Sequence, residues 1–144
     1  MAKHVVAKVD EIPLGERKIV ALEGRSIGVF HVQGSFYALR NRCPHQGGPL
    51  CAGQLSGFVT AELPGQYEYT RKGEILRCPW HGWEFDVKTG QSWFDPEKMR
   101  VRSYEVCVEK GTDIEGELAG LSKGPYVAET YAVTVEDDYV VVTI

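Results

Sequence analysis

The amino-acid sequence predicts an all-β protein, an antiparallel β sandwich or barrel-like fold built as one domain. Short apolar or alternating runs recur along the chain, and Gly, Pro, Asn and Asp residues mark turns between them. Only one segment has a helical pattern, and no low-complexity segment or interdomain linker interrupts the chain. A length of 144 residues also suits a single domain with one core.

The expected strands are short and follow one another at even spacing. Before the first cysteine they are Val5–Val9, Lys18–Leu22, Ile27–Val32 and Phe36–Arg40. Later in the chain they are Trp83–Val87, Val101–Val108, Tyr131–Val135 and Tyr139–Ile144. The one helix candidate is Thr112–Gly124, with Asp113 as its candidate cap, although Gly116 and Gly120 weaken it.

Two Pro- and Gly-rich loops each combine one cysteine with one histidine: Cys43 with His45, and Cys78 with His81. Such a set can hold a [2Fe–2S] cluster, with two cysteines on one iron and two histidines on the other. Zinc accepts the same donors, usually as a Cys pair and a His pair at wider spacings. The mixed, tight pairs favour the two-iron cluster, because each loop can then give one ligand to each iron. Structural cysteines with incidental histidines are the less favoured alternative.

The segments CPHQGGPL and CPWHGWEFD resemble the two cluster-binding boxes of Rieske [2Fe–2S] proteins, over roughly residues 1–110. The resemblance implies a Rieske-like antiparallel β sandwich with one cluster per chain, bound by Cys43, His45, Cys78 and His81. We expect a base of residues 1–42 and 96–144 and a small cluster-binding subdomain of residues 43–95. The stretch between the boxes is about twice the family's usual length, and Ser56–Ile75 is expected to form an added hairpin.

The remaining cysteines are not expected to be redox groups. Respiratory members of the family carry one further cysteine in each box, joined in a disulfide. The resemblance places Gly48 and Trp80 at those positions, so that bridge is absent. Cys51 and Cys107 are then expected to be small buried hydrophobic residues.

The chain lacks the residues that catalysis would need. A Rieske oxygenase holds a second iron with two histidines and a carboxylate, but no histidine follows His81. His4 and His31 lie in or beside expected strands, and no Gly-x-Gly-x-x-Gly fingerprint is present. We therefore expect no catalytic residues and a one-electron carrier between a flavin-dependent reductase and a terminal oxygenase. Two alternatives stay open: a small Rieske-like subunit of a larger redox enzyme such as a nitrite reductase, and a redox sensor.

The resemblance also implies a low reduction potential. Replacing two thiolates by two histidines removes negative charge and raises the potential above that of plant-type ferredoxins. High-potential members add hydroxyl groups at the positions of Trp83 and Phe85, neither of which has one. We expect a potential near the lower end of the Rieske range, at roughly −150 mV. An apolar collar around an exposed His45–His81 edge is expected from Trp80, Trp83, Pro49 and Leu50.

Charge and targeting signals complete the expectations. The net charge of −4 argues against nucleic-acid binding and fits docking on basic partner surfaces. The first residues, Met1–Val6, resemble neither a signal peptide nor a twin-arginine leader. No run of apolar residues is long enough to span a membrane. We therefore expect a cytoplasmic protein with no membrane partner.

Overall fold

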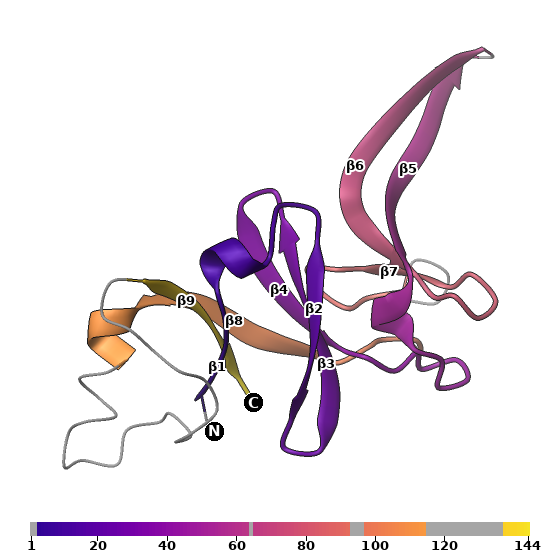
Figure 1. The fold of residues 1–144 in the computed structure, drawn as a ribbon. Coiled ribbons are helices and arrows are strands. Elements are labelled where there is room, and N and C mark those ends of the chain that lie inside the picture. The colour runs from indigo at the N-terminus through magenta and orange to yellow at the C-terminus, as the bar shows by residue number, and fades with distance from the viewer. Residues whose placement is uncertain (1–2, 64, 93–96, 115–136) are drawn as a thin grey trace.

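The computed structural model describes residues 3–63, 65–92, 97–114 and 137–144. Figure 1 shows a body of strands from which one long hairpin projects. The larger sheet has six strands in the order β1-β9-β8-β4-β3-β2, and the smaller has three in the order β5-β6-β7. All the strand pairs are antiparallel. The all-β prediction is therefore confirmed.

The strands of the larger sheet match the expected ones closely. They are β1 (Lys3–Lys8), β2 (Arg17–Leu22), β3 (Arg25–Val32), β4 (Ser35–Arg40), β8 (Ser103–Lys110) and β9 (Asp138–Thr143). Those of the smaller sheet are β5 (Gln54–Leu63), β6 (Gln66–Arg77) and β7 (Glu84–Asp86). Two short 3-10 turns, η1 (Val9–Glu11) and η2 (Leu50–Ala52), complete the named elements.

Strand β8 joins the two halves of the larger sheet. Its first residues, Ser103 and Tyr104, pair with β4, whereas Glu105–Lys110 pair with β9. The sheet curls around a core to which β1, β9, β3 and β4 all contribute apolar side chains. Strand β9 lies between β1 and β8, so a segment near the end of the chain joins the first strand to the rest of the sheet (Figure 1).

Strand β3 explains how the body holds two cores. Its alternating side chains point to opposite faces of the sheet. Ile27 and Val29 belong to the core inside the curled sheet, whereas Phe30 and Val32 belong to a second core that contains Cys43 and Cys78. Because both faces of β3 are covered, apolar residues occur at both sets of alternating positions from Ile27 to Val32. The second core thus attaches the two ligand loops to the larger sheet.

The projecting hairpin consists of β5 and β6 (Figure 1). This confirms the hairpin expected at Ser56–Ile75, although the paired strands extend further, from Gln54 to Arg77. The expected strand Trp83–Val87 is shortened to Glu84–Asp86, because Trp83 closes the preceding loop and a turn begins at residue 87. Residues 111–114 are helical, and the rest of the Thr112–Gly124 helix lies outside the described residues. The expected strand Tyr131–Val135 also lies outside them.

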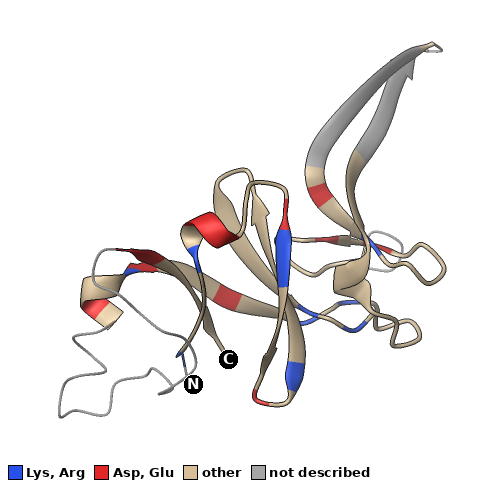
Figure 2. Cartoon of the chain, viewed as in Figure 1, with Lys and Arg blue, Asp and Glu red and all other residues tan. Residues whose placement is uncertain are grey.

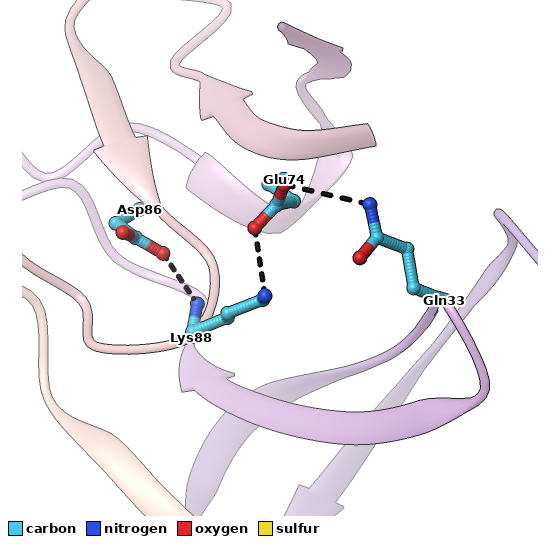
Figure 3. Close-up of polar contacts among 4 residues, drawn as sticks. All are labelled: Gln33, Glu74, Asp86 and Lys88. Carbon is cyan, nitrogen blue, oxygen red and sulfur yellow. Dashed lines mark hydrogen bonds and ion pairs between the residues drawn. The ribbon is translucent and has the colours of Figure 1, made fainter. Parts of the chain in front are cut away.

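A buried carboxylate connects the base of the hairpin with its surroundings. Glu74 of β6 is 6% exposed. Its carboxylate forms an ion pair with the Lys88 Nζ atom, in the turn after β7, at a distance of 2.7 Å. The Gln33 side-chain amide, in the β3–β4 turn, donates to the same carboxylate at 3.4 Å, and Asp86 accepts from the Lys88 backbone N–H at 2.9 Å (Figure 3). The contact with Gln33 therefore ties the smaller sheet to the larger one.

Candidate metal centre

The first ligand loop is a tight turn between β4 and η2. The Cys43 N–H donates to the Gly48 carbonyl at 2.8 Å, and the Gly47 N–H donates back to the Cys43 carbonyl at 2.7 Å. Gly47 has a φ of 78°, a left-handed conformation that glycine adopts at low cost. The Gly47 N–H thus helps to close this turn.

The second ligand loop lies between β6 and β7. The Cys78 N–H donates to the Trp83 carbonyl at 2.7 Å, which closes the loop. Both His81 and Gly82 have left-handed φ angles, of 66° and 72°. A histidine in this region carries local strain that the surrounding structure must hold, and such residues concentrate at functional sites.

The structure brings the two thiols together. Cys43 and Cys78 are 1% and 2% exposed and share one apolar core, and their side chains lie within hydrogen-bonding reach of each other. Burial raises the pKa of the Cys78 thiol, the backbone N–H of Trp80 lowers it, and the adjacent Cys43 thiol raises it further. Two thiols in an apolar site can bind a metal ion as thiolates, because the cation compensates their charge.

The structure also brings the two imidazoles together. The ring centroids of His45 and His81 are 5.2 Å apart, and the rings are nearly perpendicular, at 85°. His45 is half-buried and packs against Trp83 at 4.8 Å between centroids, whereas His81 is exposed. The buried His45 Nδ1 atom has no hydrogen-bond partner among the described residues. A buried ring nitrogen without a partner is available to a metal ion.

The four predicted site residues are therefore sorted by chemistry, thiol beside thiol and imidazole beside imidazole. A [2Fe–2S] cluster with mixed ligation needs this arrangement, since one iron takes both sulfurs and the other takes both nitrogens. Across the described parts of the chain, no three His, Cys, Asp or Glu side chains gather around a single point as one metal ion would require. Two protein ligands on each iron are compatible with that geometry, and the donor set fits the cluster.

Aromatic side chains enclose the site, but not as the sequence suggested. Phe85 is fully buried in the core that contains Cys43 and Cys78, and Trp83 packs against this core. Trp80 is 49% exposed, as a surface collar requires, whereas Leu50 is fully buried. The expectation that Leu50 forms part of the collar is wrong, because the η2 turn directs it into the core.

The positions that carry the disulfide cysteines in respiratory relatives are neighbours here. A Cβ atom built on Gly48 would lie 2.8 Å from the Trp80 indole, so the ring occupies the space above this glycine. Apolar packing between the two loops thus stands where those relatives have a covalent bridge. Sequence reasoning identified the missing disulfide, but the indole contact follows only from the fold.

The other cysteines and histidines lie outside the site. Cys51 is fully buried, and burial raises its pKa to about 12, against the opposing effects of the Gly28 backbone and the Arg17 charge. Cys107 was expected to be buried, but it is only partly buried. His4 is buried and contacts the Glu23 carboxylate at 2.9 Å, and His31 contacts the Ile12 carbonyl at 2.8 Å.

Two further features were missed by sequence reasoning. The first is an arginine directly before each cysteine, Arg42 in the first loop and Arg77 in the second, whose guanidinium group lies close to a glycine of the same loop. A Cβ atom on Gly47 would lie 3.4 Å from the Arg42 guanidinium, and a Cβ atom on Gly82 would lie 3.1 Å from that of Arg77. The repeated Arg-Cys-Pro pattern was the available signal. The second feature is a cavity beside the first loop, which is lined by several arginines that come from separate segments.

Comparison with known proteins gives consistent results. A family model described as "Rieske [2Fe-2S] domain" matches residues 2–105. The ferredoxin component of the naphthalene 1,2-dioxygenase system of Pseudomonas aeruginosa is 30% identical over 99 residues, which cover 69% of this chain and 80% of the relative. The structure of the ferredoxin of carbazole 1,9a-dioxygenase from Nocardioides aromaticivorans superposes with a TM-score of 0.58 at 28% identity, over 76% of this chain and 91% of that one. The Sphingomonas yanoikuyae ferredoxin gives a TM-score of 0.56 at 27% identity, over 74% of this chain and 90% of that one.

Within the described residues, no helix is long and apolar enough to cross a membrane.

Proposed function

The chain belongs to the Rieske [2Fe–2S] domain family, and from this premise we propose that Cys43 and Cys78 bind one iron of its [2Fe–2S] cluster and that His45 and His81 bind the other. The sorting of thiols and imidazoles into two pairs carries this assignment. When bound, the cluster supplies one-electron chemistry. The chain's own residues bury the thiols and leave the His81 ring exposed on the surface.

The ligand assignment can be tested by metal analysis and EPR spectroscopy. Protein made with adequate iron should contain two irons and two acid-labile sulfides, with the low average g value of mixed Cys/His ligation. His45→Ala and His81→Ala should lose the cluster or its spectrum, because metal binding and loop folding are coupled. Gln46→Ala, an exposed residue of the same loop, is the matched control and should keep both. Stoichiometric zinc in place of iron would contradict the assignment.

The chain is an electron carrier of the ferredoxin type. We infer that it accepts electrons from a flavin-dependent reductase and passes them to a terminal oxygenase. Support comes from the relatives named as ferredoxin components of dioxygenase systems, of which the chain covers most of the length. No histidine follows His81 in the sequence, where a Rieske oxygenase would supply two for its second iron, and this supports a role without catalysis of its own.

Reconstitution tests this role. A reductase and an oxygenase encoded near this chain should form product only when the holo-protein is added, and the holo-protein alone, fed with reductant, should form none. Product formation by the isolated protein would overturn the role. Size exclusion of native extract addresses the alternative of a bound subunit of a larger redox enzyme, because a free carrier elutes alone.

A further inference from the structure

A cavity of about 540 Å³ adjoins the first ligand loop. Its walls come from the loop residues Cys43–Gly47, including the proposed ligands Cys43 and His45, and from Val101. The remaining lining residues are Arg40, Arg42, Arg100 and Arg102. We call these four residues the arginine cluster. A ligand or partner that enters the cavity therefore lies next to the proposed iron ligands.

Strand pairing explains why four arginines share one cavity. Leu39 of β4 pairs with Ser103 of β8, and the Arg40 N–H donates to the Arg102 carbonyl at 2.9 Å, so Arg40 lies opposite Arg102. Residues two apart in an extended segment project from the same face. Arg100 therefore shares the face of Arg102, and Arg42 lines the same cavity from the bend that follows β4. All four are exposed, which places their charges at the surface.

Among the residues that the structure describes, this arrangement is electrostatically unfavourable. Like charges directly opposite each other on paired strands repel. None of the four guanidinium groups forms an ion pair with a residue that the structure describes, whereas Lys3, Lys8 and Lys88 each pair with a carboxylate. Among the described residues, Arg102 lies over the Tyr104 ring, with 5.4 Å from its guanidinium carbon to the ring centroid.

The local charge also opposes that of the whole chain. The net charge is −4, yet the wall of this cavity carries four positive side chains. Glu109 lies near the end of β8 that is remote from Ser103, and Asp138 begins β9 beside it. Figure 2 shows red segments at this end of the two strands. A partner that approaches within a Debye length, about 8 Å at physiological salt, responds to the local charge more than to the net charge.

We propose that the arginine cluster is the docking surface for the redox partner and that the partner presents carboxylates of Asp and Glu side chains to it; this inference rests on the proposed function as an electron carrier. Guanidinium groups bind carboxylates through paired hydrogen bonds, which fix orientation as well as supply attraction. A partner held here contacts the loop of His45, next to the exposed His81 ring. The sequence suggested a basic partner surface, but the charge around the site favours an acidic one.

The sign of a salt effect tests the local charge without any protein partner. Reduced holo-protein is mixed in stopped flow with trianionic ferricyanide or with tricationic hexaamminecobalt(III). If the arginine cluster governs the approach, oxidation by ferricyanide slows as salt is added, because salt screens an attraction. If the net charge of −4 governs it, that rate rises with salt, and the proposal is overturned.

Substitutions show whether the arginine cluster causes this salt effect. The double variant Arg40→Gln/Arg102→Gln should slow ferricyanide oxidation about tenfold at low salt and remove the salt dependence. Lys110→Gln makes a single-charge change at the opposite end of β8 and should leave the rate unchanged. Equal effects of the Arg and Lys substitutions would overturn the proposal. The reduction potential and iron content of each variant are measured alongside, so that altered driving force or cluster loss is not mistaken for altered docking.

The final experiment uses the partner protein that supports product formation in the reconstitution. Its rate of electron exchange with the wild type should fall with salt, and the double arginine variant should remove that dependence. Turnover that continues with no response to the arginine substitutions would overturn docking while the carrier function stands. Saturable inhibition of both reactions by micromolar citrate at constant ionic strength would instead identify a site for a free small anion and would also overturn docking.

Discussion

Phe85→Tyr tests the physical basis of the low reduction potential that the sequence predicts. The wild-type ring is fully buried and packs in the same core as Cys43 and Cys78. The substitution adds a single oxygen to that ring and leaves its shape otherwise unchanged. A hydroxyl that donates to a ligand thiolate or a cluster sulfur stabilises the reduced cluster more, because that state carries more negative charge. The potential should therefore rise.

The size of the shift follows from the strength of the hydrogen bond. A bond to a charged group contributes about 1.5–3 kcal/mol. With about 59 mV per tenfold change for one electron, a bond formed only in the reduced state raises the potential by about 65–130 mV. Because the site is fully buried, a hydroxyl that finds no acceptor would instead destabilise the fold by about 1–3 kcal/mol. Stability and potential thus distinguish the two outcomes.

The assay combines voltammetry with chemical unfolding. Phe36→Tyr is the matched control, because Phe36 packs against the core inside the curled sheet, away from the thiols. It should leave the potential unchanged. An unchanged or lowered potential in Phe85→Tyr, with the cluster intact, would show that the ring does not face the cluster and would refute the reasoning.

Two further substitutions test how the loops are held and how Cys51 is buried. In Gly53→Ala, the new Cβ would collide with the Arg77 carbonyl oxygen, so we expect at least about 1–3 kcal/mol of destabilisation and a lower iron content. In Gly65→Ala, whose Cβ would meet nothing within 4 Å, the left-handed φ of 83° should cost stability without loss of iron; equal iron loss in both would contradict the role of this close approach. Because burial raises the pKa of Cys51 from 9.0 to about 12, its thiol stabilises the fold below pH 9, and that contribution is lost as pH rises toward 12. In urea unfolding, Cys51→Ala should have a lower free energy of unfolding than the wild type at pH 7 but should lose less of it between pH 9 and 11. Parallel curves of unfolding free energy against pH for the two proteins would show that Cys51 does not titrate in this way.

The candidate site was the part that could be proposed most directly from the sequence. Metal binding depends on the identity of the donor atoms and on short spacings, and both are visible in Cys43–His45 and Cys78–His81. The strands of the larger sheet were also predictable within a few residues, because alternation and turn residues are local signals. The hairpin β5–β6 followed from the same kind of signal.

The tertiary structure alone decided which distant residues meet. The pairing of Arg40 with Arg102 depends on the register between β4 and β8, and strands so far apart in the chain carry no local signal of that register. The contact of Trp80 with Gly48 and the burial of Leu50 depend likewise on how the loops pack on the second core. The sequence by itself therefore determined the chemistry that the protein can hold, since this resides in side chains and short spacings. The charge and shape around that chemistry were set by long-range packing, because only the folded chain brings those segments together.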